Sequence, residues 1–391
     1  MAAPGPNAAR HHTIMTGNEN SLDICIVLGG DGFIGRHIVE SLLEHGFQVS
    51  VFDMCQTHDD VDYHLGDIRD ERQLLSALKK SGANCIIHTV SPLSTKHLLD
   101  NPAIYHSVNV DGTNSVISVA LAQNIRKLIY TSTSAVVFHG KDIINGDETL
   151  PYPLKHLDAY TESKALAEKL ILDVNGKNGL MTIALRPGGV FGPRDRETVI
   201  GAYVAFKRGL TCIQLGDNSN LFDRTYVANV ANAHVLAIKR LDNPVEICEA
   251  AGHTFFINDG QPVPFWDHMQ DIWDIFYQMF PSTPKPRYTI VIPRAIALIL
   301  ANIVLFLSWM TCRKELTFTP HNVMFATTTM YFNNDKARRV LGYEPKFSID
   351  EGMRRTAKVS QFQSLENSDA TEGQSLLRKK IVSVNDATNH R

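Results

Sequence analysis

The residues best suited to proton chemistry are Tyr160 and Lys164, in the segment DAYTESKALAEKLI. The segment is amphipathic, and residues four apart on a helix lie on one face, so the phenol and the ammonium are expected one above the other. A free phenol has a pKa of about 10 and is a poor base at neutral pH. A neighbouring ammonium favours the phenolate and lowers that pKa, which suits Tyr160 for taking the proton of an alcohol.

A third polar group should orient that alcohol. The segment IYTSTSAVVFHG offers Thr133 and Ser134 at the end of an expected strand, before the helix of Tyr160. A lone Tyr-x-x-x-Lys spacing is usually an accident, because both residue types are common on half-exposed helix faces. Together with strand-end hydroxyls and a dinucleotide-binding turn, however, the pair predicts an oxidoreductase site.

The dinucleotide-binding turn is expected in LGGDGFIGRHIVESLLEHGFQVSVFD. Gly29, Gly32 and Gly35 have G-x-x-G-x-x-G spacing, directly after an expected strand and before an expected helix. Glycine suits a turn with unusual backbone angles, close approach to a pyrophosphate, and tight packing of helix on strand. Phe33 and Ile34 then stand at the helix N-terminus, which attracts phosphate. The alternative is that the glycines only form a tight turn.

Carboxylates follow the next two expected strands. Asp53 lies 18 residues beyond Gly35, where it can accept hydrogen bonds from the adenosine ribose. It would repel the extra phosphate of NADP, so NAD is the favoured cofactor and NADP the alternative. Asp67 and Ile68 follow the third strand and are expected to hold the adenine, although Asp67 could equally be the N-cap of the next helix.

Short apolar runs alternate with helical patterns along the chain. Runs that are apolar on both faces suit central strands of a parallel sheet, and strand-helix repetition predicts a doubly wound α/β (Rossmann) fold. We assign this domain to 22–187, a smaller C-terminal substrate lobe to 188–362, and disordered ends to 1–21 and 363–391. The predicted strands are DICIVLGG, FQVSVFD, VDYHLGD, ANCIIHTV, RKLIYTS and LMTIALRPGG.

Composition excludes several classes of protein. The chain of 391 residues has a formal net charge of −3 and no basic stripe, which argues against nucleic-acid binding. Its six cysteines include no Cys-x-x-Cys pair and are expected to be reduced thiols in a cytosol-facing protein. No metal site is expected, because metal-ligand spacing is absent around His88, His106, His139 and His156.

Six features follow one another along the chain in the order GGDGFIG, Asp53, GDIRD, YTSTSAVVFHG, YTESK and RPGGVFGPRD. In this order they resemble the extended short-chain dehydrogenase/reductase family over 24–342. The more specific segments are VVFHGKDIINGDETLPYP, INDGQPVPFWDH and TFTPHNVMFATTTMYFNNDKARRVLGYEP. They resemble the 3β-hydroxysteroid dehydrogenase branch and, within it, the decarboxylating sterol-4α-carboxylate 3-dehydrogenases. The resemblance implies that Tyr160 is the proton acceptor and Lys164 the ribose-binding lysine. Thr133 stands where the family usually has serine, with Ser134 as the alternative. The expected cofactor site also includes Thr89, Val90 and Pro187.

The resemblance implies NAD(P)-dependent oxidation of the 3β-hydroxyl of a 4α-carboxysterol to the ketone, with loss of carbon dioxide. Arg186, Arg194 and Arg224 are candidates to bind the carboxylate, although salt bridges within the protein are the commoner role for arginine. The alternatives are a 3β-hydroxysteroid dehydrogenase/isomerase, a sugar-nucleotide epimerase-like enzyme, and a non-catalytic NAD-binding membrane scaffold.

A strongly apolar segment, 295–310 within 290–312, is flanked by Arg294, Arg313 and Lys314 and contains Trp309. It is short for a spanning helix unless residues 290–292 join it, and the alternatives are a buried lid helix or a helix in contact with a membrane. A sterol substrate favours the membrane. The resemblance further implies the cytosolic face of the endoplasmic reticulum, lipid droplets as a second location, a homodimer, and other sterol C-4 demethylation enzymes as partners.

Overall fold

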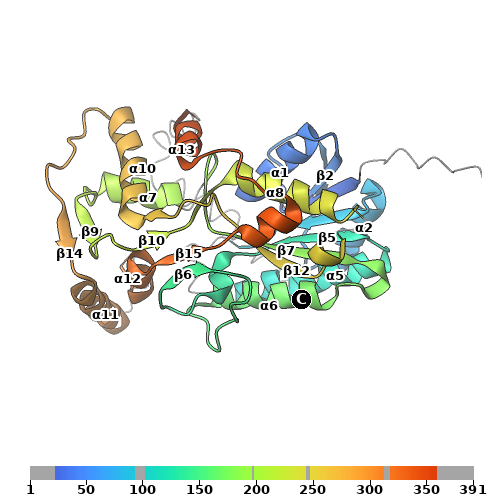
Figure 1. The fold of residues 1–391 in the computed structure, drawn as a ribbon, viewed down its shortest axis with the longest axis horizontal. Helices are drawn as coiled ribbons and strands as arrows, with labels where there is room; N and C mark the ends of the chain where they lie inside the picture. Colours follow the sequence, from blue (N-terminus) through green and yellow to red (C-terminus); the bar gives the residue numbers. More distant parts are fainter. Residues whose placement is uncertain (1–22, 93–101, 196–197, 244–246, 312–317, 359–391) are drawn as a thin grey trace, which may run out of the picture.

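The computed structural model describes residues 23–92, 102–195, 198–243, 247–311 and 318–358 (Figure 1). The ends predicted to be disordered, 1–21 and 363–391, lie outside these residues.

A seven-stranded sheet forms the centre of the larger lobe, in the order β12-β7-β5-β4-β1-β2-β3. Every pairing in it is parallel, which confirms the predicted parallel α/β fold. The six predicted strands all form, and the seventh comes from beyond residue 187. The strands are β1 (Ile24–Leu28), β2 (Gln48–Asp53), β3 (Asp62–Leu65), β4 (Cys85–His88), β5 (Lys127–Thr131), β7 (Met181–Pro187) and β12 (His253–Ile257).

Helices cover both faces of this sheet. Along β1, Cys25 and Val27 pack against one helical layer, whereas Ile26 and Leu28 pack against the other. Side chains alternate between the faces of a strand, so a strand buried on both faces must be apolar at every position. One layer contains α1 (Phe33–Glu44) and α8 (Val227–Arg240); the other contains α2 (Glu71–Ser81), α5 (Gly112–Ala122) and α6 (Ala159–Asp173) (Figure 1).

The smaller lobe has short strands and its own apolar clusters. A four-stranded sheet contains β13 (Val263–Pro264), β10 (Leu221–Phe222), β15 (Met330–Phe332) and β6 (Ile143–Gly146), and the two-stranded pairs are β8 (Gly189–Phe191) with β11 (Arg224–Tyr226) and β9 (Ile213–Leu215) with β14 (Ile290–Ile292). The helices around them are α7 (Thr198–Lys207), α10 (Phe265–Met279), α11 (Arg294–Thr311), α12 (Pro320–Thr327) and α13 (Ile349–Lys358).

The apolar segment forms the single helix α11, at the opposite end of the molecule from α2 (Figure 1). Residues 290–292 do not extend it, because they form strand β14 against β9. Ala297 and Ala301 are fully buried in a small cluster with Val323 of α12. Within the described ranges, no helix has the length and apolar character needed to cross a membrane. Arg313 and Lys314 lie outside those ranges.

Candidate active site

The glycine turn joins β1 to α1 and contacts the end of β4. Gly29 has φ of +83°, and a Cβ there would lie 2.8 Å from Thr89 Oγ1 and 3.1 Å from Val90 N. A Cβ on Gly35 would lie only 2.0 Å from Gly29 O. Side chains at these positions would therefore force the turn, the helix and the end of β4 apart. The structure brings the predicted residues Gly29, Gly35, Thr89 and Val90 together.

The N-terminus of α1 is free of side-chain caps. Gly32 is the N-cap in extended conformation, and the first turn contains no acidic residue. The first backbone N–H groups of a helix lack partners within the helix, and the helix dipole favours an anion there. The side chains of Phe33 and Ile34 pack partly against apolar clusters, so any contact that they make to a phosphate comes from the backbone.

Two carboxylates lie beside this turn. Asp53, at the end of β2, accepts hydrogen bonds from the N–H groups of Asp31 (3.0 Å) and Met54 (2.7 Å). Asp31 belongs to the glycine turn itself, and its carboxylate accepts from Thr57 Oγ1 at 2.6 Å. This arrangement provides acceptors for the hydroxyls of a ribose and negative charge that opposes a phosphate in the same place.

The residues after β3 make contacts within the protein. Asp67 forms an ion pair with Arg69 at 2.5 Å, and Asp70 caps α2 by accepting from the N–H of Arg72 at 3.0 Å. The alternative that Asp67 is the N-cap is therefore wrong. Ile68 is buried in the apolar cluster between the sheet and α2, so its side chain contributes to the core.

Helix α6 carries the predicted proton-transfer pair. It begins one residue before Tyr160, and its N-cap Asp158 accepts from the N–H of Thr161 at 2.7 Å. The half-buried ring of Tyr160 packs edge-on against Tyr105, with centroids 5.8 Å apart. Lys164 is buried, and its Nζ donates to Thr131 O at the end of β5 (2.6 Å). The helix thus fixes the lysine against the strand end that also carries the hydroxyl residues.

The environment of Lys164 is unusual for an ammonium. Burial lowers the pKa of Lys164 to about 7, and the negative charge of Glu168 partly opposes this. Glu168 lies four residues further along the same helical face and is itself fully buried. It accepts hydrogen bonds from Arg186 (2.6 Å) and Tyr152 (2.5 Å). Lys164 Nζ also lies 4.3 Å from the centroid of the Tyr130 ring.

Three consecutive hydroxyl residues follow β5, and the structure distinguishes them. Thr133 is half-buried and its Oγ1 accepts from the N–H of Ala135 at 3.2 Å, whereas Ser134 is 4% exposed. Thr133 is therefore the better placed of the two predicted hydroxyls to reach a ligand. The sequence interpretation missed Ser132, whose buried Oγ lacks a hydrogen-bond partner in the described part of the chain. Its position beside β7, shown by its N–H bond to Leu185 O at 2.7 Å, cannot be predicted from a run of Thr and Ser.

Pro187 ends β7, beside β5, and is buried. His88 is also buried, and its Nε2 shares a hydrogen bond with Thr113 Oγ1 at 3.0 Å. The described residues contain no group of three His, Cys, Asp or Glu side chains that could hold a metal ion. The side chains at this edge of the sheet offer the phenol of Tyr160, the amine of Lys164 and the hydroxyls that follow β5.

The chain is similar in sequence to known proteins. The model of the 3-beta hydroxysteroid dehydrogenase/isomerase family matches residues 26–282. The chain is 36% identical over 353 residues to the decarboxylating sterol-4-alpha-carboxylate 3-dehydrogenase of Candida albicans, covering 86% of this chain and 97% of that protein. The Homo sapiens protein of the same name is 36% identical over 348 residues, covering 87% and 89%.

Solved structures show the same fold at low identity. The UDP-glucose 4-epimerase of Thermus thermophilus, in complex with NAD, has a TM-score of 0.63 and 22% identity, covering 85% of this chain and 97% of that one. An epimerase from Methanothermobacter thermautotrophicus has a TM-score of 0.67 and 20% identity, covering 92% and 95%. Its family match and its curated relatives place the chain in the 3-beta hydroxysteroid dehydrogenase/isomerase family.

Proposed function

We propose that this protein uses NAD to oxidise the 3β-hydroxyl of a 4α-carboxysterol to a ketone, with loss of carbon dioxide. The substrate class comes from the activity for which its relatives in Candida albicans and Homo sapiens are named. The single observation that carries the chemistry is the position of Lys164, buried one helical turn from Tyr160 and bonded to the end of β5. Burying an ammonium is unfavourable, which points to a role other than stability.

The residues around the glycine turn fit NAD. Gly29, Gly32 and Gly35 allow a tight turn that packs closely between β1 and α1, and the uncapped N-terminus of α1 suits the pyrophosphate. Asp53 would accept from the adenosine ribose, and the carboxylates of Asp31 and Asp53 support NAD over NADP. When bound, NAD supplies an acceptor for the hydride of the carbinol carbon.

Three side chains act on the substrate in this proposal. Thr133 holds the 3β-hydroxyl by a hydrogen bond, and Tyr160, as phenolate, takes its proton. Lys164, as ammonium, stabilises the phenolate and binds the nicotinamide ribose. The oxidised sterol is a β-keto acid: the C4–carboxyl bond breaks, carbon dioxide leaves, and the bonding electrons move into the ketone to form an enolate. Donors at Tyr160 and Thr133 stabilise that oxyanion, which then takes a proton at C4.

The direct test supplies purified protein with NAD and a 4α-carboxysterol and measures reduced cofactor and carbon dioxide together. We expect one carbon dioxide for each reduced NAD. Reduced NAD without carbon dioxide would instead support the dehydrogenase/isomerase alternative. Turnover of a UDP-sugar would support the epimerase-like alternative. Formation of neither reduced NAD nor carbon dioxide, without turnover of a UDP-sugar, would support the non-catalytic NAD-binding scaffold.

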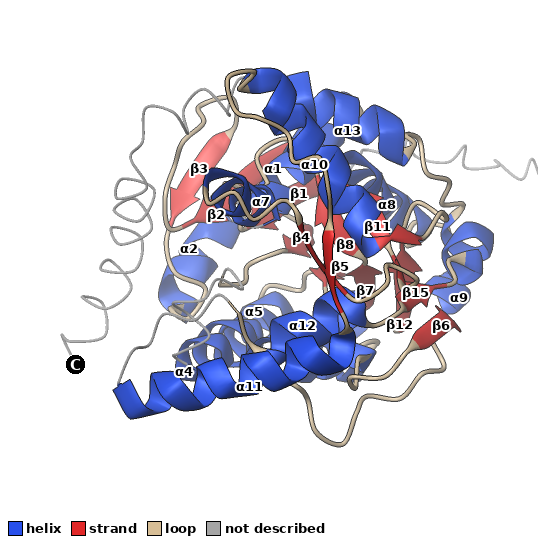
Figure 2. Cartoon of the chain, turned by 90° about the vertical axis from the view of Figure 1, so that its left-hand side faces the viewer, coloured by secondary structure: helices blue, strands red, loops and turns tan. Residues whose placement is uncertain are grey.

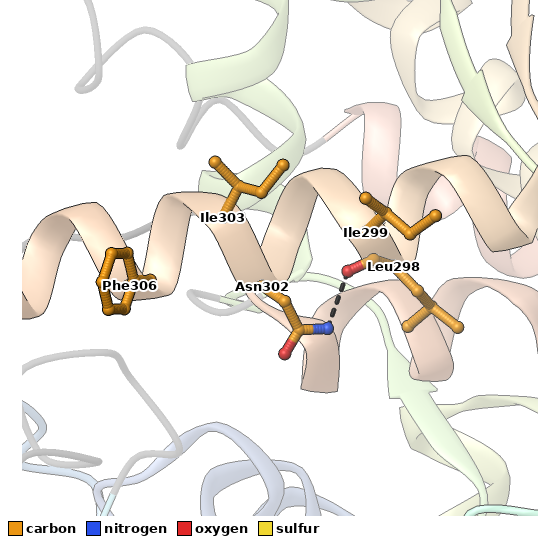
Figure 3. A pocket seen from close by; sticks show the side chains of 5 residues that line it. All are labelled: Leu298, Ile299, Asn302, Ile303 and Phe306. Carbon is orange, nitrogen blue, oxygen red and sulfur yellow. Dashed lines mark hydrogen bonds between the residues drawn. The ribbon is translucent and has the colours of Figure 1, made fainter.

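We also propose that α11 lies in the surface of a membrane, which is where a sterol resides. Its outward apolar side chains are exposed, including Ile299 (61%) and Phe306 (57%). Figure 3 shows Leu298, Ile299, Asn302, Ile303 and Phe306 around a shallow hollow along the helix. The amide of Asn302 donates to Leu298 O at 2.8 Å, so this polar group is bonded within the helix.

Such a patch supports a membrane contact because soluble surfaces rarely expose so many neighbouring apolar side chains. Helices with an apolar face bury that face at the boundary of headgroups and acyl chains. The membrane that we propose is the cytosolic face of the endoplasmic reticulum.

The double change Ile299→Asp with Phe306→Asp should release the protein from vesicles of phosphatidylcholine and phosphatidylserine. Each side chain contributes about 1.5–3 kcal/mol when it leaves water, so we expect binding to fall more than tenfold in a co-sedimentation assay. Leu43→Asp, an exposed leucine on α1 at the other end of the molecule, is the matched control. Equal vesicle binding by the double variant and the control would contradict a membrane role for α11.

A further inference from the structure

Two of the three arginines considered for the substrate carboxylate are already neutralised within the protein. Arg186 binds Glu168 through its Nε and Nη2 atoms, with the shortest contact at 2.6 Å. Arg194 binds Glu40 at 2.6 Å. Arg224 differs from both: it is 4% exposed, and in the described ranges it forms neither an ion pair nor a hydrogen bond.

The surroundings of Arg224 are apolar. Its guanidinium carbon lies 5.0 Å from the ring centroid of Phe222 and 5.4 Å from that of Phe265. Nε is buried without a partner, as are both ring nitrogens of His268 among the described residues. Burial and the charge of Arg224 keep the pKa of His268 well below its usual range, so that the imidazole is neutral.

An arginine in this setting still carries its charge. Burial lowers the pKa of Arg224 to about 10, which leaves it protonated at pH 7, and the negative charge of Asp195 opposes the shift. Removing one partner of a buried ion pair is strongly destabilising because it leaves a charge without compensation. Here the protein holds such a charge beside two phenyl rings and almost out of contact with water. A ligand with an anionic group would complete the missing pair.

The strand order brings Arg224 to the same edge of the sheet as the candidate active site. Arg224 on β11 pairs in register with Gly189 on β8, and Gly189 follows the end of β7 by two residues. In turn, β7 neighbours β5, whose last residue accepts the bond from Lys164 (Figure 2). A Cβ on Gly189 would lie 2.7 Å from the Phe222 ring and 3.3 Å from Arg224 Nη1, so glycine lets β8 pack closely against Phe222 and the guanidinium.

We propose that Arg224 binds the carboxylate of the substrate and so selects 4-carboxysterols over sterols that lack the carboxylate. This inference rests on the proposed function. The planar guanidinium can bind a carboxylate through two parallel N–H···O hydrogen bonds, which suits selection of this group. The reacting hydroxyl and the carboxylate are on neighbouring carbons, so Arg224 and Tyr160 face the same part of the sterol. Loss of carbon dioxide removes the group that Arg224 binds, which favours release of the product.

The test compares kcat/KM for a 4α-carboxysterol with that for the 4α-methyl sterol, both followed by reduction of NAD. For Arg224→Gln we expect the preference for the carboxylated sterol to fall by about 100-fold, mainly through KM, because the change removes one partner of a buried charge pair. Oxidation of the methyl sterol should stay within twofold and also reports that the variant is folded. Arg224→Lys keeps the charge but not the two-bond geometry, so its loss should be intermediate.

Arg194→Gln is the matched control, since it removes an arginine that already has a carboxylate partner in the protein. An unchanged preference in Arg224→Gln, or an equal loss with both sterols, overturns the role of Arg224 and leaves the proposed function standing. A wild-type protein that oxidises neither sterol overturns the proposed function and this inference with it.

Discussion

Replacing Tyr160 by phenylalanine is expected to lower kcat for sterol oxidation by about 10³-fold, in the range observed for loss of a general base. The change removes only the phenolic oxygen. The edge-on packing of the ring against Tyr105, with centroids 5.8 Å apart, is retained. The helix around it, capped by Asp158 and fixed by the bond from Lys164 to Thr131, is also unaltered. We therefore expect thermal stability and KM to change little.

The measurement is the initial rate of NAD reduction with a 4α-carboxysterol, together with the melting temperature of each protein. Tyr288→Phe is the matched control, because Tyr288 is 70% exposed and belongs to a segment remote from α6 (Figure 1). If Tyr160→Phe kept more than a fifth of the wild-type kcat, Tyr160 would not be the base. Another group would then have to take the proton of the substrate hydroxyl.

Features that depend on neighbouring residues in the chain were predictable. The strand β1, the turn at Gly29 and the helix α1 follow from short-range periodicity and from backbone angles that only glycine adopts easily. The same applies to Tyr160 and Lys164, because a helix alone places residues four apart on one face. The parallel sheet then follows from the alternation of strands and helices.

Features that depend on contacts between distant segments were not predictable. Residues 290–292 look like the start of an apolar helix, yet pairing with β9 makes them a strand, because backbone groups next to a sheet edge gain hydrogen bonds there. The partners of three similar arginines also come from remote elements: Glu168 on α6, Glu40 on α1, and none in the described residues for Arg224. Sequence spacing carries no information about such pairs.

Replacing Lys164 by methionine should make the protein less active and more stable. Without the ammonium the phenol of Tyr160 is a weaker acid, and we expect kcat/KM to fall by about 10²-fold or more. Methionine has a similar length and no charge, so it fills the buried site without the desolvation penalty. The bond to Thr131 is lost, which offsets part of the gain. We expect a net increase in the free energy of unfolding of about 1–3 kcal/mol at pH 7.

The pH dependence separates this explanation from a simple improvement in packing. The pKa of Lys164 is about 7 in the folded protein and about 10.5 when exposed, so between these values the folded chain binds fewer protons than the unfolded one. The stability of the wild type should therefore rise with pH in this window, because only the unfolded chain still carries this proton and the cost of removing it on folding falls as the pH rises. The methionine variant lacks this group, so its advantage should be largest near pH 6.5 and shrink towards pH 9.5. Urea unfolding of both proteins at these two pH values measures the difference. An advantage that stays constant with pH would show that Lys164 is not carrying a buried charge.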